Sequence, residues 1–375
     1  MVGSRRARLG PPNSGAAPFV RESVSEPMIV QKSPFCTYRH LTFQPQQVPI
    51  RPPPTRDQVL PVLVSHALPS EPLALPSAVA FGNFDGLHMG HRALLAHLRA
   101  EADRLHGPLI VVTFDPHPLR ILHPERSPAA IDTLDGRLAY LAQLGVDRVY
   151  VLHFDEALAA VSAHIFARDW LCGLLHGRAF AVGPDMHFGR QRSGDVNLLR
   201  HIAAEVHGHV TVFGGVMWAD SRVSSSRVRH AIREGQVELA QHLLARPFCL
   251  RGTVVHGDAR GRTIGFPTAN LAVSGQVLPS NGIYAGLAGV NGRWHDAAVS
   301  IGTRPTFAGE DVRVEAYLLD FDGDIYDQPM DLEFVARLRD EAKFADLPAL
   351  IAQIQQDVVA TRRVLAAHHA RGAQP

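Results

Sequence analysis

The chain has 375 residues, more than a single hydrophobic core usually organises, so we expect two domains together with additional segments. Its 37 Lys and Arg residues nearly balance its 36 Asp and Glu residues, which leaves no net field to favour nucleic acid or an anionic membrane surface. No stretch approaches the ~18 consecutive apolar residues that a membrane-spanning helix needs. We therefore expect neither a nucleic-acid partner nor a membrane partner.

The cysteines indicate a reducing environment. Cys36, Cys172 and Cys249 are odd in number and include no CxxC pair, which argues against a disulfide framework and against a cysteine zinc site. We therefore expect a cytoplasmic protein. The basic start of the chain runs into prolines rather than an apolar stretch, which argues against a secretory signal and leaves a transit peptide as the alternative.

Residues 1–72 are rich in proline and show no sustained apolar period. Such a composition predicts a disordered or loosely ordered N-terminal extension that carries no chemistry. Met28 is an alternative start, because the residues before it show no structural pattern.

Residues 73–246 alternate short apolar runs with helical periods. This alternation is typical of βαβ units and predicts a Rossmann-like, doubly wound parallel sheet. The expected strands cover residues 78–84, 109–114, 148–153, 179–182 and 209–213. The expected helices cover residues 93–105, 137–145, 156–175, 197–206 and a tail that ends at residue 244.

Residues 247–375 show a different pattern, in which strand-like segments are separated by Gly, Asp and Asn. This spacing predicts a small antiparallel β-barrel followed by one C-terminal helix over residues 347–365. The expected strands cover residues 249–255, 283–290, 294–300, 312–319 and 330–335. The apolar face of the helix is expected to contain Leu350, Ile351, Ile354, Val358 and Val359.

A glycine-rich turn lies where the first strand of the predicted sheet meets its helix, the position where open α/β sheets bind ligands. Gly82, Gly86 and Gly90 would let the backbone approach a phosphate closely, and the amides at the helix start favour negative charge. His88 and His91 are three residues apart and can both donate to phosphate oxygens. Two alternatives are a chance pair of histidines in a tight turn and a His-x-x-His metal site.

The segment 82–91 resembles the His-x-Gly-His signature of the nucleotidyltransferase superfamily, in a form similar to that of bacterial FAD synthetases. Three further segments, 112–118, 182–189 and 223–229, resemble the family's later motifs and follow in the same order. Two positions depart from the family pattern. Met186 stands where the family usually has an aromatic residue, and Ser226 replaces a threonine.

This resemblance implies an α/β nucleotidyltransferase that adenylates FMN. The FMN phosphate would attack the α-phosphorus of ATP and pyrophosphate would leave, so catalysis would rest on positioning and charge neutralisation. His88, His91 and Arg227 would stabilise the phosphates, and Asp185 and Phe188 would border the flavin. The resemblance assigns ATP binding to Gly82, Phe84, Asp85, Gly90, Ser225 and Ser226. Read alone, the serines are an N-cap before a surface helix.

A second glycine-rich stretch, residues 252–270, lies beside a predicted strand and has no Walker motif. By composition alone it could form hairpin turns. Thr268 and Asn270 are two apart, so on an extended backbone they face the same side and offer neutral oxygens to a hard cation. Mg²⁺ that bridges ATP phosphates suits such sparse ligation, because this ion keeps most of its waters.

Residues 261–270 resemble the signature of riboflavin kinases, and the segments 302–307, 314–315, 319–321, 325–326 and 338–344 follow in family order. The resemblance implies that Glu315 is the general base for the riboflavin 5′-hydroxyl and that Thr268 and Asn270 hold Mg²⁺. It assigns ATP binding to Gly252, Gly257, Gly261, Arg262, Gly265 and Pro267. Family members often have Asn where Thr303 or its neighbours lie, so these positions carry less weight. Read alone, Glu315 is a solvated strand position.

The order of the two resemblances is that of the bifunctional bacterial riboflavin kinase and FAD synthetase family. The expected small-molecule partners are ATP, riboflavin and FMN, with Mg²⁺ as the cofactor, and self-association is left open. One alternative is a nucleotidyltransferase for a pantetheine or pyridine nucleotide substrate, which leaves the C-terminal motifs unexplained. Another is a flavin-binding or regulatory protein that has lost its chemistry, which the presence of both sets of polar residues disfavours.

Overall fold

The computed structural model describes residues 62–257, 260–306 and 309–372, all of which belong to one compact unit of the chain, residues 40–375. Residues 1–61 of the expected loosely ordered extension, with Met28 and Cys36, lie outside the described residues. Among the described helices, none has both the length and the apolar character needed to cross a bilayer.

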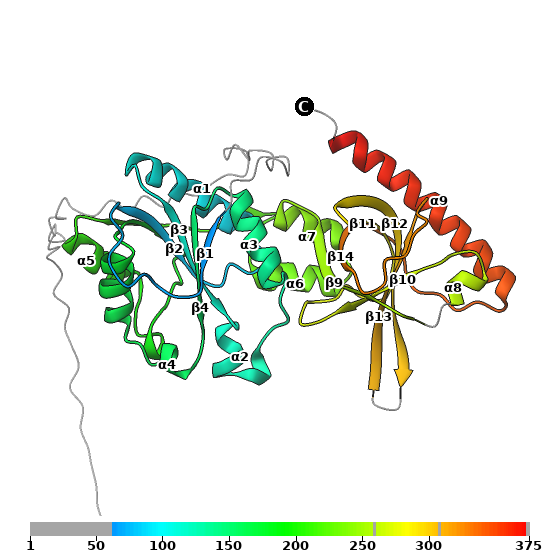
Figure 1. Ribbon diagram of the computed structural model, residues 1–375, viewed down its shortest axis with the longest axis horizontal. Helices are drawn as coiled ribbons and strands as arrows, with labels where there is room; N and C mark the ends of the chain where they lie inside the picture. The colour runs from blue at the N-terminus through cyan, green and yellow to red at the C-terminus, as the bar shows by residue number, and fades with distance from the viewer. Residues whose placement is uncertain (1–61, 258–259, 307–308, 373–375) are drawn as a thin grey trace, which may run out of the picture. The chain divides into compact units, whose positions relative to one another are not determined.

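The first half of the described chain is a six-stranded sheet in which every neighbouring pair of strands is parallel (Figure 1). This confirms the predicted parallel sheet. In sheet order the strands are β1 (Leu63–Ser65), β4 (Arg148–His153), β3 (Leu109–Asp115), β2 (Ser77–Phe81), β5 (Gly177–Val182) and β6 (His209–Val212). The chain leaves the central strand β2 toward β3 and returns later on its other side as β5, so the carboxyl end of β2 is the switch point where such sheets bind ligands.

Strand β1 lies upstream of the boundary expected at residue 72. It pairs in parallel with the edge strand β4, Leu63 opposite Arg148. Leu68 and Leu73 also pack against one face of the sheet. The sheet therefore includes residues from the segment that was expected to be loosely ordered, and this part of the prediction is wrong. A three-residue strand gave no apolar period for the sequence pattern to reveal.

Helices cover both faces of the sheet, because alternate strand residues point to opposite sides. On one face, Ala78 and Val111 pack with α1 (Met89–Arg104) and α3 (Leu134–Gln143). On the other face, Val79 and Ile110 pack with η4 (Ile165–Leu174) and α5 (Val196–Glu205). The short helical elements are α2 (Pro118–Leu122), η3 (Pro124–Arg126), α4 (Glu156–Ala159) and η5 (Arg190–Arg192).

The single helix expected over residues 156–175 is two helices, α4 and the π-helix η4. Asp155 caps the first, since its carboxylate accepts the Leu158 amide at 2.7 Å. Ser162 then accepts the Ile165 amide at 3.2 Å, which starts a new helix. A second cap inside an apolar run therefore divides what its composition presents as one helix.

The second half is a closed antiparallel barrel, as predicted (Figure 1). Its strands are β9 (Phe248–Val255), β10 (Ala269–Val273), β11 (Gly282–Val290), β12 (Arg293–Thr306), β13 (Gly309–Leu318) and β14 (Pro329–Arg339). Strand β10 was not among the strands expected. It closes the barrel by pairing with both β9 and β13. A short helix, α8 (Arg260–Thr263), precedes it.

Helix α9 (Leu347–Gly372) packs on β11, β12 and β14, but its buried stripe differs from the expected apolar face. Val359 is 69% exposed, whereas Asp357, Thr361 and Leu365 are buried. Arg339, at the end of β14, donates to both oxygens of Asp357 at 2.8 and 2.6 Å. A partly buried ion pair therefore favours this rotation of the helix, and hydropathy alone does not reveal it.

A hairpin and two helices connect the halves: β7 (Met217–Trp218), β8 (Ser221–Arg222), α6 (Ser225–Arg233) and α7 (Val237–Leu244). Helix α7 packs against β14 and β9 of the barrel. Its side chains Leu243 and Leu244 belong to one hydrophobic cluster that contains residues of both the sheet and the barrel interior. Among the described residues, the two halves therefore share a continuous core.

Candidate active sites

The glycine-rich turn between β2 and α1 adopts a backbone that few side chains tolerate. Phe84 and Leu87 have φ of 49° and 43°, and Gly86 has φ of 81°. A Cβ on Gly86 would lie 2.8 Å from Cδ1 of Ile131, so this position requires glycine for its space as well as its conformation. The turn stands at the carboxyl end of the central strand, where the sequence placed the phosphate site.

The two histidines of this turn are stacked on each other. Their ring centroids are 3.8 Å apart with an interplanar angle of 15°, and the ring of Phe84 lies 5.1 Å from that of His91. His88 is the N-cap of α1, and its Nδ1 accepts the His91 amide at 3.4 Å. Within the described structure, the buried Nδ1 of His91 has no hydrogen-bond partner. The stacking and the helix cap thus hold the two rings in place.

Both rings are neutral at pH 7. Burial lowers the pKa of His88 to about 4, and the charges of Arg222 and Arg229 act in the same direction. Burial, together with the neighbouring His88, holds the pKa of His91 well below 6.5. A phosphate bound beside the rings would oppose these shifts, since an anion within a few ångströms favours the protonated form.

The start of α6 meets the same turn. Ser225 Oγ donates to the Asp85 carbonyl at 2.9 Å, which brings the first and fourth motifs together. Ser224 caps the helix by accepting the Arg227 amide at 3.2 Å, and Ser226 is exposed. The Arg227 guanidinium donates to the carbonyls of Trp218 and Ser221 at 2.9 and 2.8 Å, so it holds the β7–β8 hairpin.

Two of the expected binding residues have side chains turned into the protein. Asp85 accepts the amides of Ile131 and Asp132 at 3.0 to 3.2 Å and pairs with Arg229, so its carboxylate anchors the turn. Phe188 is 8% exposed, and its ring packs against Phe81 and Phe166 in the core. Motif position alone does not tell which member of a motif supports the site and which faces the ligand.

Asp185, the other residue expected near the flavin, is exposed, and its carboxylate pairs with Arg222 at 2.7 Å. Met186, which departs from the family pattern, packs against the cluster that contains Phe188. In the third motif, the Asp185 carboxylate therefore lies at the surface, whereas the Phe188 ring is buried.

The barrel brings together the three polar residues expected in the second site. The register of β10 and β13 sets Asn270 directly opposite Glu315. Thr268 stands just before β10 and donates from Oγ1 to Oε2 of Glu315 at 3.3 Å. The strand β10, which the sequence did not predict, carries Asn270 to the carboxylate, and Thr268 immediately precedes that strand. Hydroxyl, amide and carboxylate oxygens are hard donors that fit Mg²⁺.

The glycines of this second site differ in what they do. A Cβ on Gly257 would lie 2.2 Å from Nδ2 of Asn270, and one on Gly261 would lie 2.2 Å from the Phe266 carbonyl, so both permit close approach within the site. Gly265 has φ of 87° and open space around its Cα. Gly252 instead lies inside β9, where a Cβ would meet the Ala272 carbonyl at 2.1 Å. Two further expected residues, Arg262 and Pro267, are exposed.

Comparison with known proteins agrees with this arrangement. A family model described as FAD synthetase matches residues 71–227, and one described as riboflavin kinase matches residues 244–365. The bifunctional riboflavin kinase/FMN adenylyltransferase of Escherichia coli K12 is 40% identical over 285 residues, which cover 76% of this chain and 91% of that protein. This chain belongs to the bifunctional riboflavin kinase/FMN adenylyltransferase family.

Other members of the family show a similar extent of likeness. The proteins of the same name from Pseudomonas fluorescens and Bacillus subtilis are 39% and 35% identical, and the matches cover 92% and 90% of their lengths. A solved structure from Streptococcus pneumoniae, described as a macrolide-efflux protein, matches with a TM-score of 0.73 and 31% identity. That match covers 80% of this chain and 98% of the other. The riboflavin kinase match accounts for the C-terminal motifs that a nucleotidyltransferase for another substrate left unexplained.

Sequence reasoning missed residues that support the adenylyltransferase half of this family member. Asn83 Nδ2 and His117 Nε2 are 2.9 Å apart. The Asn83 carbonyl accepts from Arg137 Nη1 at 2.8 Å and from Thr113 Oγ1 at 3.3 Å. Asn83, Thr113 and His117 stand inside the recognised motifs, so those motifs could have pointed to them. Arg137 lies in an ordinary amphipathic helix of an arginine-rich chain, and nothing in its local sequence distinguishes it.

Sequence reasoning also missed contacts around the kinase half. The rings of His256 and Tyr326 stack at 3.8 Å, next to Gly257. Asn281 Nδ2 donates to Thr303 Oγ1 at 2.7 Å and to Glu341 Oε2 at 3.3 Å, which joins two of the downstream motifs. Only the closure of the barrel makes these partners neighbours.

Proposed function

We propose that the two sites act in succession, with the barrel site converting riboflavin to FMN and the turn between β2 and α1 converting FMN to FAD. The observation that carries the first step is the convergence of Thr268, Asn270 and Glu315, which joins a base to hard oxygen donors. The observation that carries the second is the stacked His88–His91 pair at the switch point of a parallel sheet.

In the kinase step, Glu315 would take the proton of the riboflavin 5′-hydroxyl as its oxygen attacks the γ-phosphorus of ATP, and ADP would leave. The hydrogen bond from Thr268 fixes one carboxylate oxygen and leaves the other for the substrate. Mg²⁺, held by Thr268 and Asn270, would neutralise the ATP phosphates. Gly257 and Gly261 would let the backbone approach those phosphates closely.

In the adenylyl-transfer step, an FMN phosphate oxygen would attack the α-phosphorus of ATP and pyrophosphate would leave. The neutral rings of His88 and His91 would donate to the phosphates as charge develops, in a buried position where such donors are most effective. Ser226 and the backbone from Gly82 to Gly90 would add donors. Arg227 would act on the phosphates if its guanidinium leaves the hairpin carbonyls, and Asp185 would border the flavin.

Four further points belong to the same proposal. The adenylyltransferase unit would run through residue 246 and the kinase unit would begin at residue 247. Mg²⁺ would be the metal in use. The protein would act in the cytoplasm, where the buried free thiols of Cys172 and Cys249 persist. Self-association would be possible.

Product analysis tests this function directly. The purified chain would be incubated with riboflavin, ATP and MgCl₂ and the flavins separated by chromatography, and then incubated with FMN in place of riboflavin. We expect FMN followed by FAD in the first reaction and FAD alone in the second. Absence of both products would exclude the function, and FMN without FAD would restrict the chain to the kinase reaction. Omission of MgCl₂ with added chelator should stop FMN formation.

A further inference from the structure

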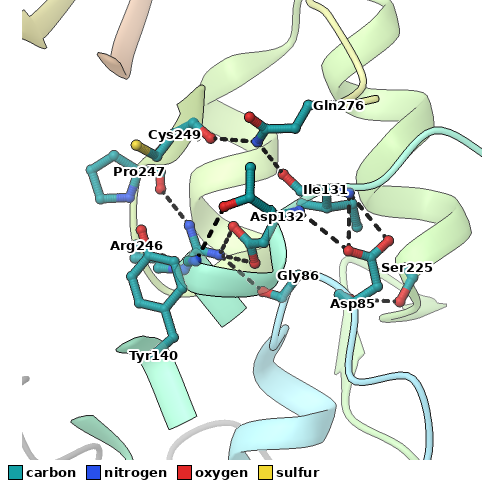
Figure 2. A network of polar contacts seen from close by, with 12 residues as sticks. Asp85, Gly86, Ile131, Asp132, Tyr140, Ser225, Arg246, Pro247, Cys249 and Gln276 are labelled. Atoms are coloured by element: carbon teal, nitrogen blue, oxygen red, sulfur yellow. Dashed lines mark hydrogen bonds and ion pairs between the residues drawn. The ribbon is translucent and has the colours of Figure 1, made fainter. Parts of the chain in front are cut away.

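A buried arginine at the junction with the barrel contacts the glycine turn of the other site (Figure 2). Nη2 of Arg246 donates to the Gly86 carbonyl at 3.2 Å and to the two carboxylate oxygens of Asp132 at 2.9 and 2.7 Å. The Arg246 side chain is 10% exposed and that of Asp132 is fully buried. The guanidinium also lies 3.7 Å above the ring of Tyr140. These contacts fix the guanidinium in one position.

The segment that contains Asp132, the ion-pair partner of Arg246, also hydrogen-bonds to the turn at Asp85. The amides of Ile131 and Asp132 donate to the carboxylate of Asp85, the residue just before Gly86 (Figure 2). The space beside Gly86 is filled by Ile131 and Leu244, both within 3.2 Å of where a Cβ would stand. The turn is therefore held at three points: the carboxylate of Asp85, the carbonyl of Gly86, and the apolar contact beside Gly86.

The barrel supplies the outer anchor of the same segment. Gln276 Nε2 donates to the carbonyls of Ile131 and Cys249 at 3.0 and 3.1 Å, and its Oε1 accepts the Arg251 amide at 2.9 Å. The Ala130 amide donates to the Gly275 carbonyl, and its carbonyl accepts the Val277 amide, both at 2.8 Å. Residues 130–132 thus form a bridge between the turn and the barrel.

We propose that Arg246 is a positioning residue for adenylyl transfer, which fixes the turn two residues before His88, and that Gln276 anchors it to the barrel. This inference rests on the proposed assignment of adenylyl transfer to the turn. It predicts that the two reactions differ in whether they need this contact between the halves. FAD formation needs the barrel even though the reaction takes place on the sheet, whereas FMN formation does not need Arg246, because the whole of β9 separates it from the kinase site.

The test replaces Arg246 in the full chain and measures both reactions on the same preparation. We expect Arg246→Met to lower kcat for FAD formation from FMN by about tenfold or more, since small misplacements of a reactive geometry are costly. KM for ATP and kcat for riboflavin phosphorylation should stay within about twofold of the parent. Arg246→Lys keeps the charge and should recover part of the lost kcat.

Glu238→Ala is the matched control. The Glu238 carboxylate on α7 accepts the Arg337 amide of β14 at 2.9 Å, so it joins the same two halves without touching the turn. This variant should form FAD at the parental rate. If Arg246→Met does not fold, Gln276→Ala cuts the same link from the barrel side and should lower kcat for FAD formation while FMN formation persists.

Parental FAD formation by Arg246→Met would overturn the inference, as would parental FAD formation by Gln276→Ala where Arg246→Met does not fold. Equal losses in both reactions would also overturn it. So would a loss of FAD formation in Glu238→Ala as large as that in Arg246→Met. A parent that forms no FAD would overturn the assignment of the turn, and this inference with it. A parent that forms FAD alongside a fully active Arg246→Met would overturn this inference alone.

Discussion

Glu315 on β13 and Asn270 on β10 face each other across two hydrogen-bonded strands, and the Thr268 hydroxyl donates to the same Glu315 carboxylate at 3.3 Å. Two residues that are close in the sequence and a third that is distant from them thus form one cluster of oxygens. A lone glutamate on a strand would be solvated, whereas this one has a partner that orients it. Its protonation chemistry can be separated experimentally from its role in the barrel.

Replacement of Glu315 by Gln should stop the kinase reaction and spare the other. The amide keeps the size of the side chain and can still accept from Thr268, but it cannot take a proton, and loss of a general base costs about 10² to 10⁴-fold in rate. FMN formation should fall by this factor in a steady-state assay, while FAD formation from supplied FMN stays parental. Glu238→Gln is the control and should leave both rates unchanged, because the Glu238 side chain on α7 accepts the Arg337 amide and contacts neither site. Normal riboflavin phosphorylation by Glu315→Gln would remove this residue from the mechanism.

Replacement of His91 by Ala should have the opposite selectivity. It removes one preorganised donor from the stacked pair, which costs on the order of 10²-fold in the rate of a reaction that develops charge. FAD formation from FMN should fall accordingly and FMN formation should persist. His201, which is exposed on α5 and lies 3.6 Å from the Glu205 carboxylate of its own helix, provides the control substitution to Ala. Equal damage to both reactions would show that the two sites are not independent.

The free energy of unfolding should decline as the pH falls below 6.5, the pKa of an unfolded histidine. In the folded state burial lowers the pKa of His88 to about 4, whereas an unfolded histidine titrates near 6.5. The unfolded state therefore binds the extra proton between these values, and the free energy of unfolding should fall by up to about 1.4 kcal/mol per pH unit for this residue. Urea unfolding at pH 7, 6 and 5 measures this slope. His88→Asn keeps a capping side chain and should show a shallower slope, and identical slopes would contradict the assignment.

Truncation of the N-terminus should have a sharp boundary. Deletion of residues 1–61 removes no recognised motif, and both activities should stay within about twofold of the full chain. Deletion of residues 1–72 also removes β1 and Leu68, which pair with and pack on the sheet, so its Tm should drop. Thermal unfolding and product assays of the two truncations provide the comparison. Equal Tm values would show that the edge strand contributes no stability.

Elements with a local apolar pattern could be predicted from the sequence. Features that depend on contacts between distant residues could not. Alternating apolar runs identified the parallel sheet, since each strand of such a sheet is buried on both faces. Strand β10 escaped notice because its five residues follow a glycine-rich stretch that reads as turns. The rotation of α9 depends on the Asp357–Arg339 pair, which joins residues 18 apart and carries no periodic signal.

The candidate site followed the same division. The motifs identified His88, His91, Thr268, Asn270 and Glu315, which the fold gathers into two clusters. They did not reveal that the Asp85 carboxylate supports the turn from behind, or that Arg137 holds the Asn83 carbonyl. These roles arise from burial and long-range hydrogen bonds, which no short window of sequence contains.

The continuous core that runs from the sheet through α7 into the barrel bears on how this protein can be recombined. A chimera that joins the sheet of one relative to the barrel of another at residue 246 would set the Leu243–Leu244 surface of one parent against strands β9 and β14 of the other. Core surfaces tolerate such mismatches poorly, because volume changes of a single methylene are felt. Helix α7 and the barrel would therefore have to come from the same parent. Gly86 and Leu244 would then come from different parents, and their contact would have to be compatible between the two.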